Sequence, residues 1–498
     1  TRSIQYYIYI PKAACPPVRR FSFLIIIFMN ILRKSIIALF ALTAFGTTAA
    51  QASGTDDEST KKIKLEKAYR FRVTLADKKQ NPYSIKQPEK FLSAKALARR
   101  AKYKIAVDNY DLPITPKYID ALKNAGAKIH NMSKWNNTVV VETSDSLLCD
   151  KIKQLPFVSN VRHVWTAPDS VDAPNFANRQ KEVTNRPDTL EQLYGKGFEQ
   201  ISQLNALRLH EAGFTGKGVT IAVLDGGFHN ADCITAWRKE QILGTRNFVR
   251  PERSVYDELS HGMMVLSCIA SRVPHSLIGT APDASFYLIV CEDGESEQLV
   301  EEDNWCAAIE YADSLGADIA TSSLGYTGFD HKWMDFPYHA LDGQTELCSR
   351  SASLAASRGI LVLNSAGNSG MSSWKKIGVP ADAKDILAVG AVNETGENTW
   401  FSSIGNSADG RIKPDVMARG GYAAVLDTNG ENAEANGTSF SCPILCGVTA
   451  CLLQASPKST PVQIIRALQS SGHNAAHPDN IFGYGIPDAW KAYESMKH

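Results

Sequence analysis

Residues 219–227 read Val-Thr-Ile-Ala-Val-Leu-Asp-Gly-Gly, an almost continuous apolar run that ends in an acid and two glycines. Such a run is typical of a strand buried on both faces, as in a parallel sheet covered by helices. Further apolar runs follow it, with helical patterns between them. From residue 201 onward the sequence therefore predicts an α/β domain with a mainly parallel sheet and helices on both faces. We expect its strands at 219–224, 285–290, 319–322, 360–364 and 386–392, and its helices at 261–271, 300–315, up to 358 and at 439–454.

Polar residues cluster where these strands end and where two of the helices begin. Asp225 ends the first strand, His261 opens a helix within Ser-His-Gly, Asn368 follows a strand within Ser-Ala-Gly-Asn-Ser-Gly, and Ser439 opens the long helix within Asn-Gly-Thr-Ser-Phe-Ser-Cys-Pro. Each of these motifs is common by itself, because an acidic residue after a strand often lies in a turn and a histidine often caps a helix. In a parallel sheet, however, the carboxyl ends of the strands meet at one edge, where active sites gather.

These residue types supply the parts of a nucleophilic hydrolase. A serine hydroxyl is a weak nucleophile and needs an adjacent base, here His261. A buried carboxylate, here Asp225, holds the imidazole in the useful tautomer and stabilises its charged form. The Asn368 amide and the backbone N–H of Ser439 are candidate donors to the oxyanion that forms when Ser439 attacks a carbonyl.

The four motifs and their order resemble the subtilisin-like serine peptidases. Asp225-Gly-Gly, His261-Gly, Ala366-Gly-Asn368 and Gly437-Thr-Ser439-x-x-x-Pro443 match in sequence, and the order Asp, His, Ser differs from that of chymotrypsin and of the α/β-hydrolases. The resemblance covers about residues 205–495 and implies an endopeptidase acting on polypeptides. It implies Asp225, His261 and Ser439 as the triad, Asn368 in the oxyanion hole, and substrate binding by Ser323, Leu324, Gly325, Ala366 and Gly367.

Three positions depart from the pattern of that family. Gly226 stands where Ser or Thr is common, Met263 where Thr is usual, and Phe440-Ser-Cys where Met-Ala-Ser is more usual. These changes alter the packing around the triad and keep its reactive groups. Two other classes fit less well: a lipase or esterase needs a G-x-S-x-G elbow with the serine before the histidine, and a degenerate binding module would have lost a triad member.

Residues 64–165 predict a separate small α+β domain. Residues 69–75 alternate apolar and polar as a half-buried strand does, further strands are expected at 138–142 and 158–164, and helices at 93–103, 116–125 and 144–154. The resemblance implies a prodomain of ferredoxin-like fold that assists folding and blocks the cleft as an intramolecular inhibitor. Residues 166–200, rich in Pro, Asn and Asp over 166–190, are interpreted as a linker that contains the processing site, with the catalytic domain at 201–498.

The net charge of +1 hides a strong asymmetry. Residues 64–165 contain 20 Lys and Arg against 9 Asp and Glu, a net charge of +11, whereas residues 166–498 contain 25 against 40, a net charge of −15. The two parts are therefore expected to attract each other, although two surfaces of unlike composition would look the same in sequence. No recognition motif accompanies the basic segment, so no nucleic acid partner is expected.

The N-terminal region has the pattern of a secretory signal. From Met29 a basic pair, an apolar run and small residues ending Ala-Gln-Ala52 follow one another, so residues 29–52 are interpreted as a signal peptide and 1–28 as upstream translation. No run reaches the roughly 20 apolar residues of a membrane span. The product is expected to be secreted or periplasmic and to have no membrane contact once the signal is removed.

The sequence predicts no cofactor and no metal site. The ten cysteines match no paired CxxC pattern, and Cys442 and Cys446, one helical turn apart, are expected to be buried free thiols. His473 and His477 could share a metal if helical, but Gly472, Asn474 and Pro478 favour a loop there, and residues 483–487 favour a structural turn. The acidic stretch 292–303 admits a calcium site, the first turn of a helix whose dipole favours acids, or a surface that attracts basic groups.

Overall fold

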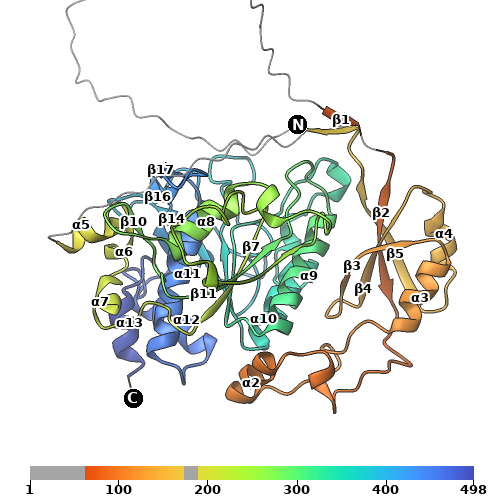
Figure 1. The fold of residues 1–498 in the computed structure, drawn as a ribbon, viewed down its shortest axis with the longest axis horizontal. Helices are drawn as coiled ribbons and strands as arrows, with labels where there is room; N and C mark the ends of the chain where they lie inside the picture. The colour runs from red at the N-terminus through yellow and green to blue at the C-terminus, as the bar shows by residue number, and fades with distance from the viewer. Residues whose placement is uncertain (1–61, 65, 173–188, 498) are drawn as a thin grey trace, which may run out of the picture. The chain divides into compact units, whose positions relative to one another are not determined.

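The apolar runs of the C-terminal part form one seven-stranded parallel sheet in the computed structural model, which describes residues 62–64, 66–172 and 189–497 (Figure 1). The strand order is β15-β14-β13-β12-β7-β11-β8, and every neighbouring pair is parallel. The strands are β7 (Thr220–Asp225), β8 (Ile242–Asn247), β11 (Ser285–Val290), β12 (Ile319–Ser322), β13 (Leu361–Ser365), β14 (Leu387–Val392) and β15 (Val416–Arg419).

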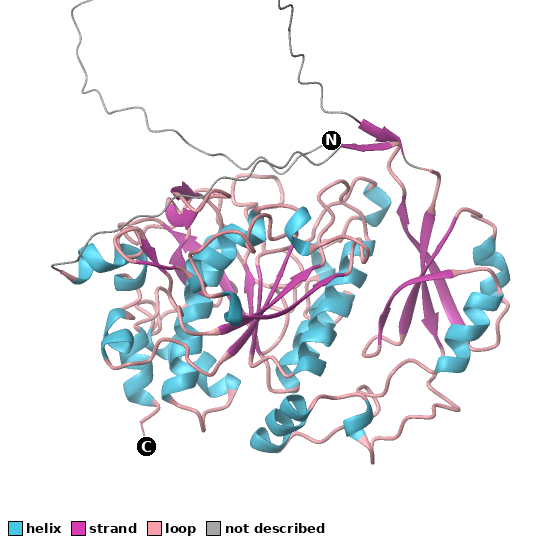
Figure 2. Ribbon diagram, viewed as in Figure 1, coloured by secondary structure: helices cyan, strands magenta, loops and turns pink. Residues whose placement is uncertain are grey.

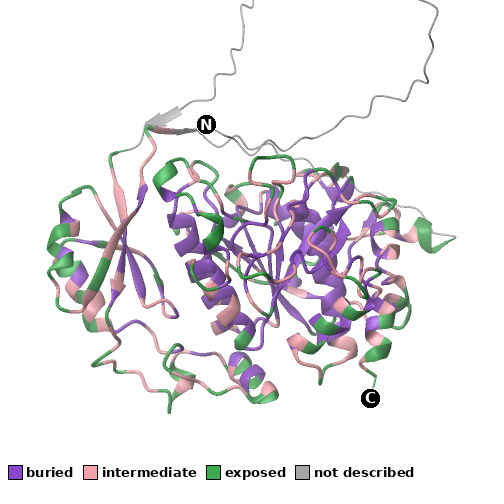
Figure 3. Ribbon diagram, turned by 180° about the vertical axis from the view of Figure 1, so that it is seen from behind, coloured by how far each residue is buried: buried purple, intermediate pink, exposed green. Residues whose placement is uncertain are grey.

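Helices cover both faces of this sheet. Alternate residues of β7 point to opposite faces, so Ile221 and Val223 pack in one core with helices α8 and α11, and Ala222 and Leu224 pack in another with α9 and α10. Figure 3 shows the buried residues concentrated along this sheet and the helices against it. The covering helices are α8 (His261–Ala270), α9 (Val300–Leu315), α10 (Leu347–Ser357) and α11 (Thr438–Ala455), with α12 (Pro461–Ser471) and α13 (Ala489–Ser495) following.

The strands that sequence reasoning missed are all edge strands. β8 and β15 are the two edges of the seven-stranded sheet, and β3 is an edge of a second sheet. An edge strand has one neighbour, so it need not carry a long apolar run, and β3 reads Lys-Ile-His-Asn-Met-Ser. Two hairpins, β9 (Arg272–Val273) with β10 (Leu277–Ile278) and β16 (Ala423–Leu426) with β17 (Asn432–Ala435), complete the C-terminal part.

The N-terminal described residues form a four-stranded antiparallel sheet with order β3-β4-β2-β5 (Figure 2). Along the chain the elements run β2, α2, α3, β3, β4, α4, β5; apart from the additional helix α2 after the first strand, this order and the strand order are the ferredoxin-like arrangement. This confirms the predicted small α+β domain. Its elements are β2 (Tyr69–Leu75), α2 (Ala94–Tyr103), α3 (Pro116–Asn124), β3 (Lys128–Ser133), β4 (Thr138–Thr143), α4 (Leu148–Lys153) and β5 (Val158–Thr166).

Local side-chain bonds set the helix starts in this domain. The Ser93 hydroxyl accepts from the backbone N–H of Ala96 at 3.1 Å, so Ser93 caps α2, which begins one residue after the predicted start at residue 93. Helix α4 begins later than the predicted residue 144. There Asp145 donates its N–H to the Thr143 hydroxyl at 3.0 Å and accepts from the Leu147 N–H at 2.9 Å. Such local bonds favour turns over helix.

The two faces of the four-stranded sheet have different partners. Phe71, Val73 and Leu75 of β2 pack against α3 and α4 in a core of their own. Residues of the opposite face, such as Val140 and Trp165, belong instead to the core that contains α9 and α10. All described residues lie in one compact unit, and the small domain is joined to the α/β domain through this second face.

Buried ion pairs cross the interface between the two domains. Arg72 donates to both carboxylate oxygens of Asp303 at 2.6 Å and to Glu302 at 3.0 Å, and all three side chains are buried. Arg100 similarly bonds Asp313 of α9 at 2.9 Å. The predicted attraction between the basic and acidic parts is thus concentrated along helix α9.

The segment predicted as a linker contains secondary structure at both ends. Its middle, residues 173–188, and the predicted upstream and signal segments at 1–52 lie outside the described residues. Strand β6 (Ser170–Asp172) pairs with β1 (Lys62–Lys64), and short helices follow at the other end. These helices are α5 (Leu190–Tyr194), α6 (Phe198–Ser202) and, just beyond the segment, α7 (Leu207–Glu211).

Helix α11 passes through the core. By length and composition it is the one helix of the described residues that could span a membrane, but 89% of its apolar window is buried inside the fold. Cys442 and Cys446 lie in it as buried free thiols, as predicted. In the described part of the chain, single-turn 3-10 helices connect the larger elements: η1 (Pro88–Lys90), η2 (Lys239–Gln241), η3 (Val255–Asp257), η4 (Lys332–Met334) and η5 (Tyr338–Ala340).

Candidate active site

An acid and a histidine are in direct contact at the carboxyl edge of the seven-stranded sheet. Asp225 is the last residue of β7 and His261 the first of α8, and the imidazole Nδ1 lies 2.7 Å from the carboxylate Oδ1. Gly262 permits this approach. A Cβ at that position would lie 2.5 Å from the carbonyl oxygen of Gly227 and 2.8 Å from the Asp225 Cβ, so any side chain would push the helix away from the strand.

The surroundings of His261 favour its charged form. Burial lowers the pKa of this imidazole, but the Asp225 charge, the hydrogen bond to Asp225 and the Glu292 charge together raise it above its ordinary value. Asp225 is fully buried, and its Oδ1 also accepts from the Gly226 N–H at 2.8 Å. A carboxylate on Nδ1 holds the neutral ring with its proton on that nitrogen, so Nε2 is the nitrogen that can accept a proton.

Ser439 lies in the first turn of α11. Its hydroxyl donates to the Ser323 carbonyl oxygen at 3.3 Å, and the Ser323 hydroxyl donates back to the Ser439 carbonyl at 2.7 Å. The next residue, Phe440, has its ring centroid 5.8 Å from that of His261. The start of α11 therefore lies beside the acid–histidine pair, with the Ser439 hydroxyl turned toward the end of β12.

Asn368 follows β13 and is bonded to the same helix start. Its side-chain oxygen accepts from both the N–H and the hydroxyl of Thr438, each at 2.9 Å. With the oxygen engaged, the orientation of the amide is set, and its NH₂ group can donate to a ligand. Asn368 is exposed, so this group is accessible.

The residues predicted to bind substrate lie at the ends of two neighbouring strands. Ser323, Leu324 and Gly325 follow β12, Ala366 and Gly367 follow β13, and the two strands pair in parallel. The Asn364 side chain joins the two strand ends by donating to the Leu324 carbonyl at 3.0 Å. The Gly367 N–H donates to the Thr438 hydroxyl at 3.1 Å and so connects the second segment to the start of α11. Gly325 is exposed, whereas Ala366 is fully buried and supports the turn from beneath.

The sequence analysis did not predict that Glu292 lies near the proposed triad. It comes two residues after Val290, which pairs in register with Asp225, and its carboxylate accepts from the Tyr326 hydroxyl at 3.0 Å. Burial raises the pKa of Glu292 to about 7, and the Asp225 charge adds to the effect. Gly226 is the position with the unusual glycine, and a Cβ there would lie 3.5 Å from the Glu292 Cβ. The register of β7 and β11 is the signal that could have found this contact.

The other sequence candidates have structural roles. Glu301, Glu302 and Asp303 occupy the first turn of α9, as the helix-dipole interpretation predicts. Residues 472–478 follow the end of α12 as turns, and the Nδ1 of His473 accepts from the Ile486 N–H at 2.9 Å, so the loop interpretation of the two histidines is confirmed. Gly483 and Gly485 both have positive φ, as a structural turn requires.

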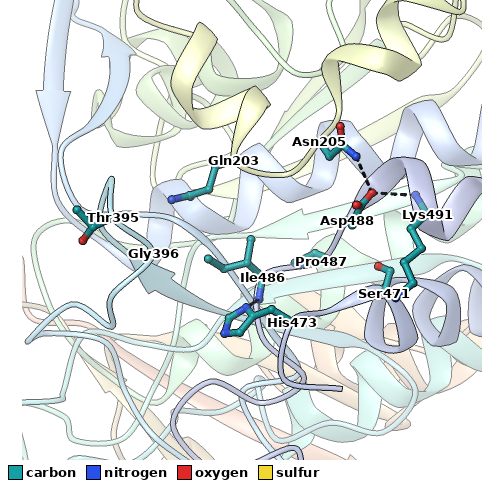
Figure 4. A pocket seen from close by; sticks show the side chains of 10 residues that line it. All are labelled: Gln203, Asn205, Thr395, Gly396, Ser471, His473, Ile486, Pro487, Asp488 and Lys491. Atoms are coloured by element: carbon teal, nitrogen blue, oxygen red, sulfur yellow. Dashed lines mark hydrogen bonds between the residues drawn. The ribbon is translucent and has the colours of Figure 1, made fainter. Parts of the chain in front are cut away.

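A pocket elsewhere in the α/β domain is lined by a different set of residues. This pocket of about 530 Å³ lies between the end of α12, the start of α13 and the α6–α7 connection (Figure 4). Its carboxylate, Asp488, caps α13 by accepting from the Lys491 N–H at 2.8 Å and also accepts from the Asn205 amide at 2.9 Å. The pocket is not lined by Asp225, His261 or Ser439, and its acid serves the fold.

Comparison with known proteins identifies both domains. Residues 216–485 match the model described as subtilase family, and residues 70–183 match the peptidase S8 propeptide domain of Bacteroidota. The chain is 32% identical over 370 residues to subtilisin NAT of Bacillus subtilis subsp. natto, covering 74% of this chain and 82% of that protein.

Other curated relatives agree. Subtilisin of Bacillus pumilus is 31% identical over 289 residues, covering 57% of this chain and 94% of that protein. M-protease of Shouchella clausii is 29% identical over 349 residues, covering 69% of this chain and 80% of that protein. With the parallel sheet and the propeptide-type domain in front of it, the chain belongs to the subtilase family and is a serine endopeptidase with a propeptide domain.

Proposed function

We propose that Asp225, His261 and Ser439 carry out peptide-bond hydrolysis in this serine endopeptidase. The observation that carries the proposal is the 2.7 Å contact between Asp225 and His261 at the sheet edge where α11 presents Ser439. In the proposed reaction, the Ser439 hydroxyl leaves the Ser323 carbonyl and donates to the imidazole instead.

The proposed reaction forms and then hydrolyses an acyl-enzyme. Ser439 Oγ attacks the scissile carbonyl carbon while its proton passes to Nε2 of His261, and Asp225 stabilises the imidazolium. The tetrahedral intermediate collapses as His261 gives that proton to the leaving amine, which departs. A water then attacks the ester, its proton passes to His261, and the carboxylic product leaves as His261 returns the proton to Ser439.

Asn368 and the start of α11 are proposed to stabilise the oxyanion. The Asn368 oxygen is held by Thr438, which leaves its NH₂ group to donate, and the backbone N–H of Ser439 is the second donor. The N-terminus of α11 also carries partial positive charge, which favours an anion at this position. Fixed donors of this kind need no reorientation as charge develops.

The substrate is proposed to bind as an added strand along residues 323–325. Gly325 is exposed at the end of β12, so an extended peptide can pair with this backbone. Ala366 and Gly367 then form the turn beneath the residue at the cut. Backbone pairing of this kind fixes the scissile bond with little dependence on side chains.

The propeptide domain is proposed to inhibit the peptidase until self-cleavage releases it. Its support is the buried ion pairs that join it to α9, together with the opposite net charges of the two parts. Cleavage is proposed between about residues 165 and 200. The signal-like pattern at 29–52 supports secretion or periplasmic release of the product.

Processing provides the test. Wild type and Ser439→Ala are expressed in full, and the N-terminus of each is determined by intact-mass and peptide mass spectrometry. The wild type is expected to lose the propeptide domain, while Ser439→Ala loses only the signal. Ser441→Ala is the matched control, because its buried hydroxyl donates to the Thr438 carbonyl within the same helix, and this variant should be processed. Equal trimming of wild type and Ser439→Ala would refute self-processing by Ser439.

A further inference from the structure

Two segments of the α/β domain contact the end of β5. Gln298 lies in the connection between β11 and α9, and Trp333 lies in η4. Strand β5 precedes the proposed processing segment, so its residues lie on the acyl side of that cut, the side whose carbonyl Ser439 would attack. No step of the proposed reaction uses Gln298 or Trp333.

Gln298 holds one residue of β5 by its backbone. Its side-chain oxygen accepts from the Thr166 N–H at 2.8 Å, and its NH₂ group donates to the Thr166 carbonyl at 2.9 Å. Only 4% of Gln298 is exposed in this arrangement. An amide that pairs with both backbone groups of a residue imitates a neighbouring strand and accepts any side chain. Once the propeptide domain leaves, this amide loses both partners, and another extended backbone would restore the two bonds.

Trp333 contacts a ring of the same strand. Its ring stacks on the His163 imidazole, with centroids 5.7 Å apart and an interplanar angle of 20°. It also stacks on His331 of its own loop, at 6.2 Å and 15°. Trp333 is still 55% exposed, so much of its surface remains available. A flat ring stacked on an indole adds stabilisation beyond burial alone, so this contact favours a ring three residues before Thr166.

The two segments are bonded to each other and to the proposed substrate strand. The Asp330 N–H donates to the Glu297 carbonyl at 2.8 Å, which joins the loop of Trp333 to the β11–α9 connection. Met334, next to Trp333, is fully buried and anchors that loop in the core. The loop also follows residues 323–325 directly in the chain. The contacts with β5 therefore extend the surface along which a substrate is proposed to bind.

We propose that Gln298 and Trp333 form a binding site for the acyl-side part of an extended polypeptide substrate. Residues 163–166 occupy this site in the precursor, and protein substrates occupy it after processing. Gln298 holds the backbone of one substrate residue, and Trp333 favours a flat ring, that of His, Phe, Tyr or Trp, three residues before it. This inference rests on the proposed reaction and adds a determinant of substrate choice to it.

Paired substrates test the site on the processed enzyme. One substrate is a short peptide that the wild type cleaves, and the others extend it on the acyl side with alanine and serine, with tryptophan at each successive position. The wild type should favour the extended peptides, most strongly with tryptophan at one position. Gln298→Ala should lower kcat/KM for the extended peptides about 5- to 100-fold, because each neutral hydrogen bond contributes roughly a factor of 2 to 10. Trp333→Ala should remove the preference for tryptophan, an effect of about 2- to 10-fold.

Binding of a labelled peptide of residues 158–172 provides a readout that does not depend on turnover. Processed enzymes are first inactivated with a fluorophosphonate, and binding is followed by fluorescence anisotropy. The His163→Ala peptide should bind the wild type about 2- to 10-fold more weakly, and the His163→Phe peptide should bind as the parent does. Neither change should matter for Trp333→Ala, because the two rings act as a pair. Trp333 is largely exposed, so this variant keeps the proposal testable if Gln298→Ala folds or processes poorly.

Lys332→Ala is the control, because Lys332 is an exposed neighbour in the same turn, and it should match the wild type in both assays. Hydrolysis of the short peptide depends on Ser439 and not on this site. A failure of the proposed reaction would therefore appear with the short peptide, and a failure of this inference only with the extended ones. The proposal is overturned if the wild type, Gln298→Ala and Trp333→Ala cleave the extended peptides equally well. Weaker binding of peptide 158–172 would not rescue it, because the site would then serve the propeptide domain alone.

Discussion

Replacing Arg72 with alanine should weaken inhibition by the propeptide domain. Arg72 lies in β2 between Phe71 and Val73, whose side chains form the core of that domain. Its own side chain points the other way, so its removal spares that core. The guanidinium bonds both oxygens of Asp303 at 2.6 Å and Glu302 at 3.0 Å, all in a buried interface.

The expected change in the inhibition constant follows from the two carboxylates that lose their partner. Without Arg72, two buried carboxylates lose their partner, and breaking a buried ion pair from one side costs about 3–5 kcal/mol. At about 1.4 kcal/mol per factor of ten, the inhibition constant should rise about 100- to 4,000-fold. If water fills the space left by the guanidinium and hydrates the two carboxylates, the rise in the inhibition constant should lie toward the lower end of this range.

The assay adds the separately produced propeptide domain, residues 64–165, to processed enzyme and measures inhibition of peptide hydrolysis. Circular dichroism first establishes that each propeptide variant is folded. Lys128→Ala is the control, because Lys128 is exposed and pairs with Glu142 of the same domain, a contact worth at most about 1 kcal/mol. A folded Arg72→Ala domain that inhibits within fivefold of wild type would refute the energetic role assigned to the interface.

Four further predictions concern the site itself. Asp225→Asn should lower kcat about 10⁴-fold in a peptide assay, because the imidazole loses the partner that sets its tautomer; a loss below tenfold would contradict that role. Asn368→Ala should lower kcat about 100- to 1,000-fold with little change in KM, and a change confined to KM would instead indicate a binding role. The pKa of His261 is raised, and the neutral ring is the base. kcat/KM should therefore fall with decreasing pH, with an inflection above about 6.5. An inflection at or below that value would be inconsistent with the Asp225 contact. Gly262→Ala should lower both activity and the thermal midpoint, because its Cβ would meet the Gly227 carbonyl; an unchanged midpoint would show that α8 can shift freely.

The central strands could be predicted from the sequence because they are buried on both faces. For 319–322 and 300–315 the expected bounds equal those of β12 and α9, since apolar strands and helical periodicity leave little choice. The edge strands β3, β8 and β15 could not be predicted in this way. Each pairs with a single neighbour, and the pattern that marks a buried strand is weaker or shorter there.

The residues of the site likewise differ in whether a local sequence pattern predicts them. Asp225, His261 and Ser439 come from short motifs whose residue types the chemistry demands, so sequence alone could nominate them. The position of Glu292 depends instead on the register of β11 against β7, which no local pattern states. The partners of Arg72 likewise depend on how two domains pack, and the net charges of the two parts predicted only that they attract.

Mapping the site of covalent inactivation tests the central assignment most directly. Processed enzyme is treated with a fluorophosphonate, digested, and its peptides are sequenced by tandem mass spectrometry. The account predicts one phosphonate per active molecule, attached to the hydroxyl of Ser439, and no adduct after the Ser439→Ala replacement. An adduct on another serine, or undiminished labelling of Ser439→Ala, would contradict it.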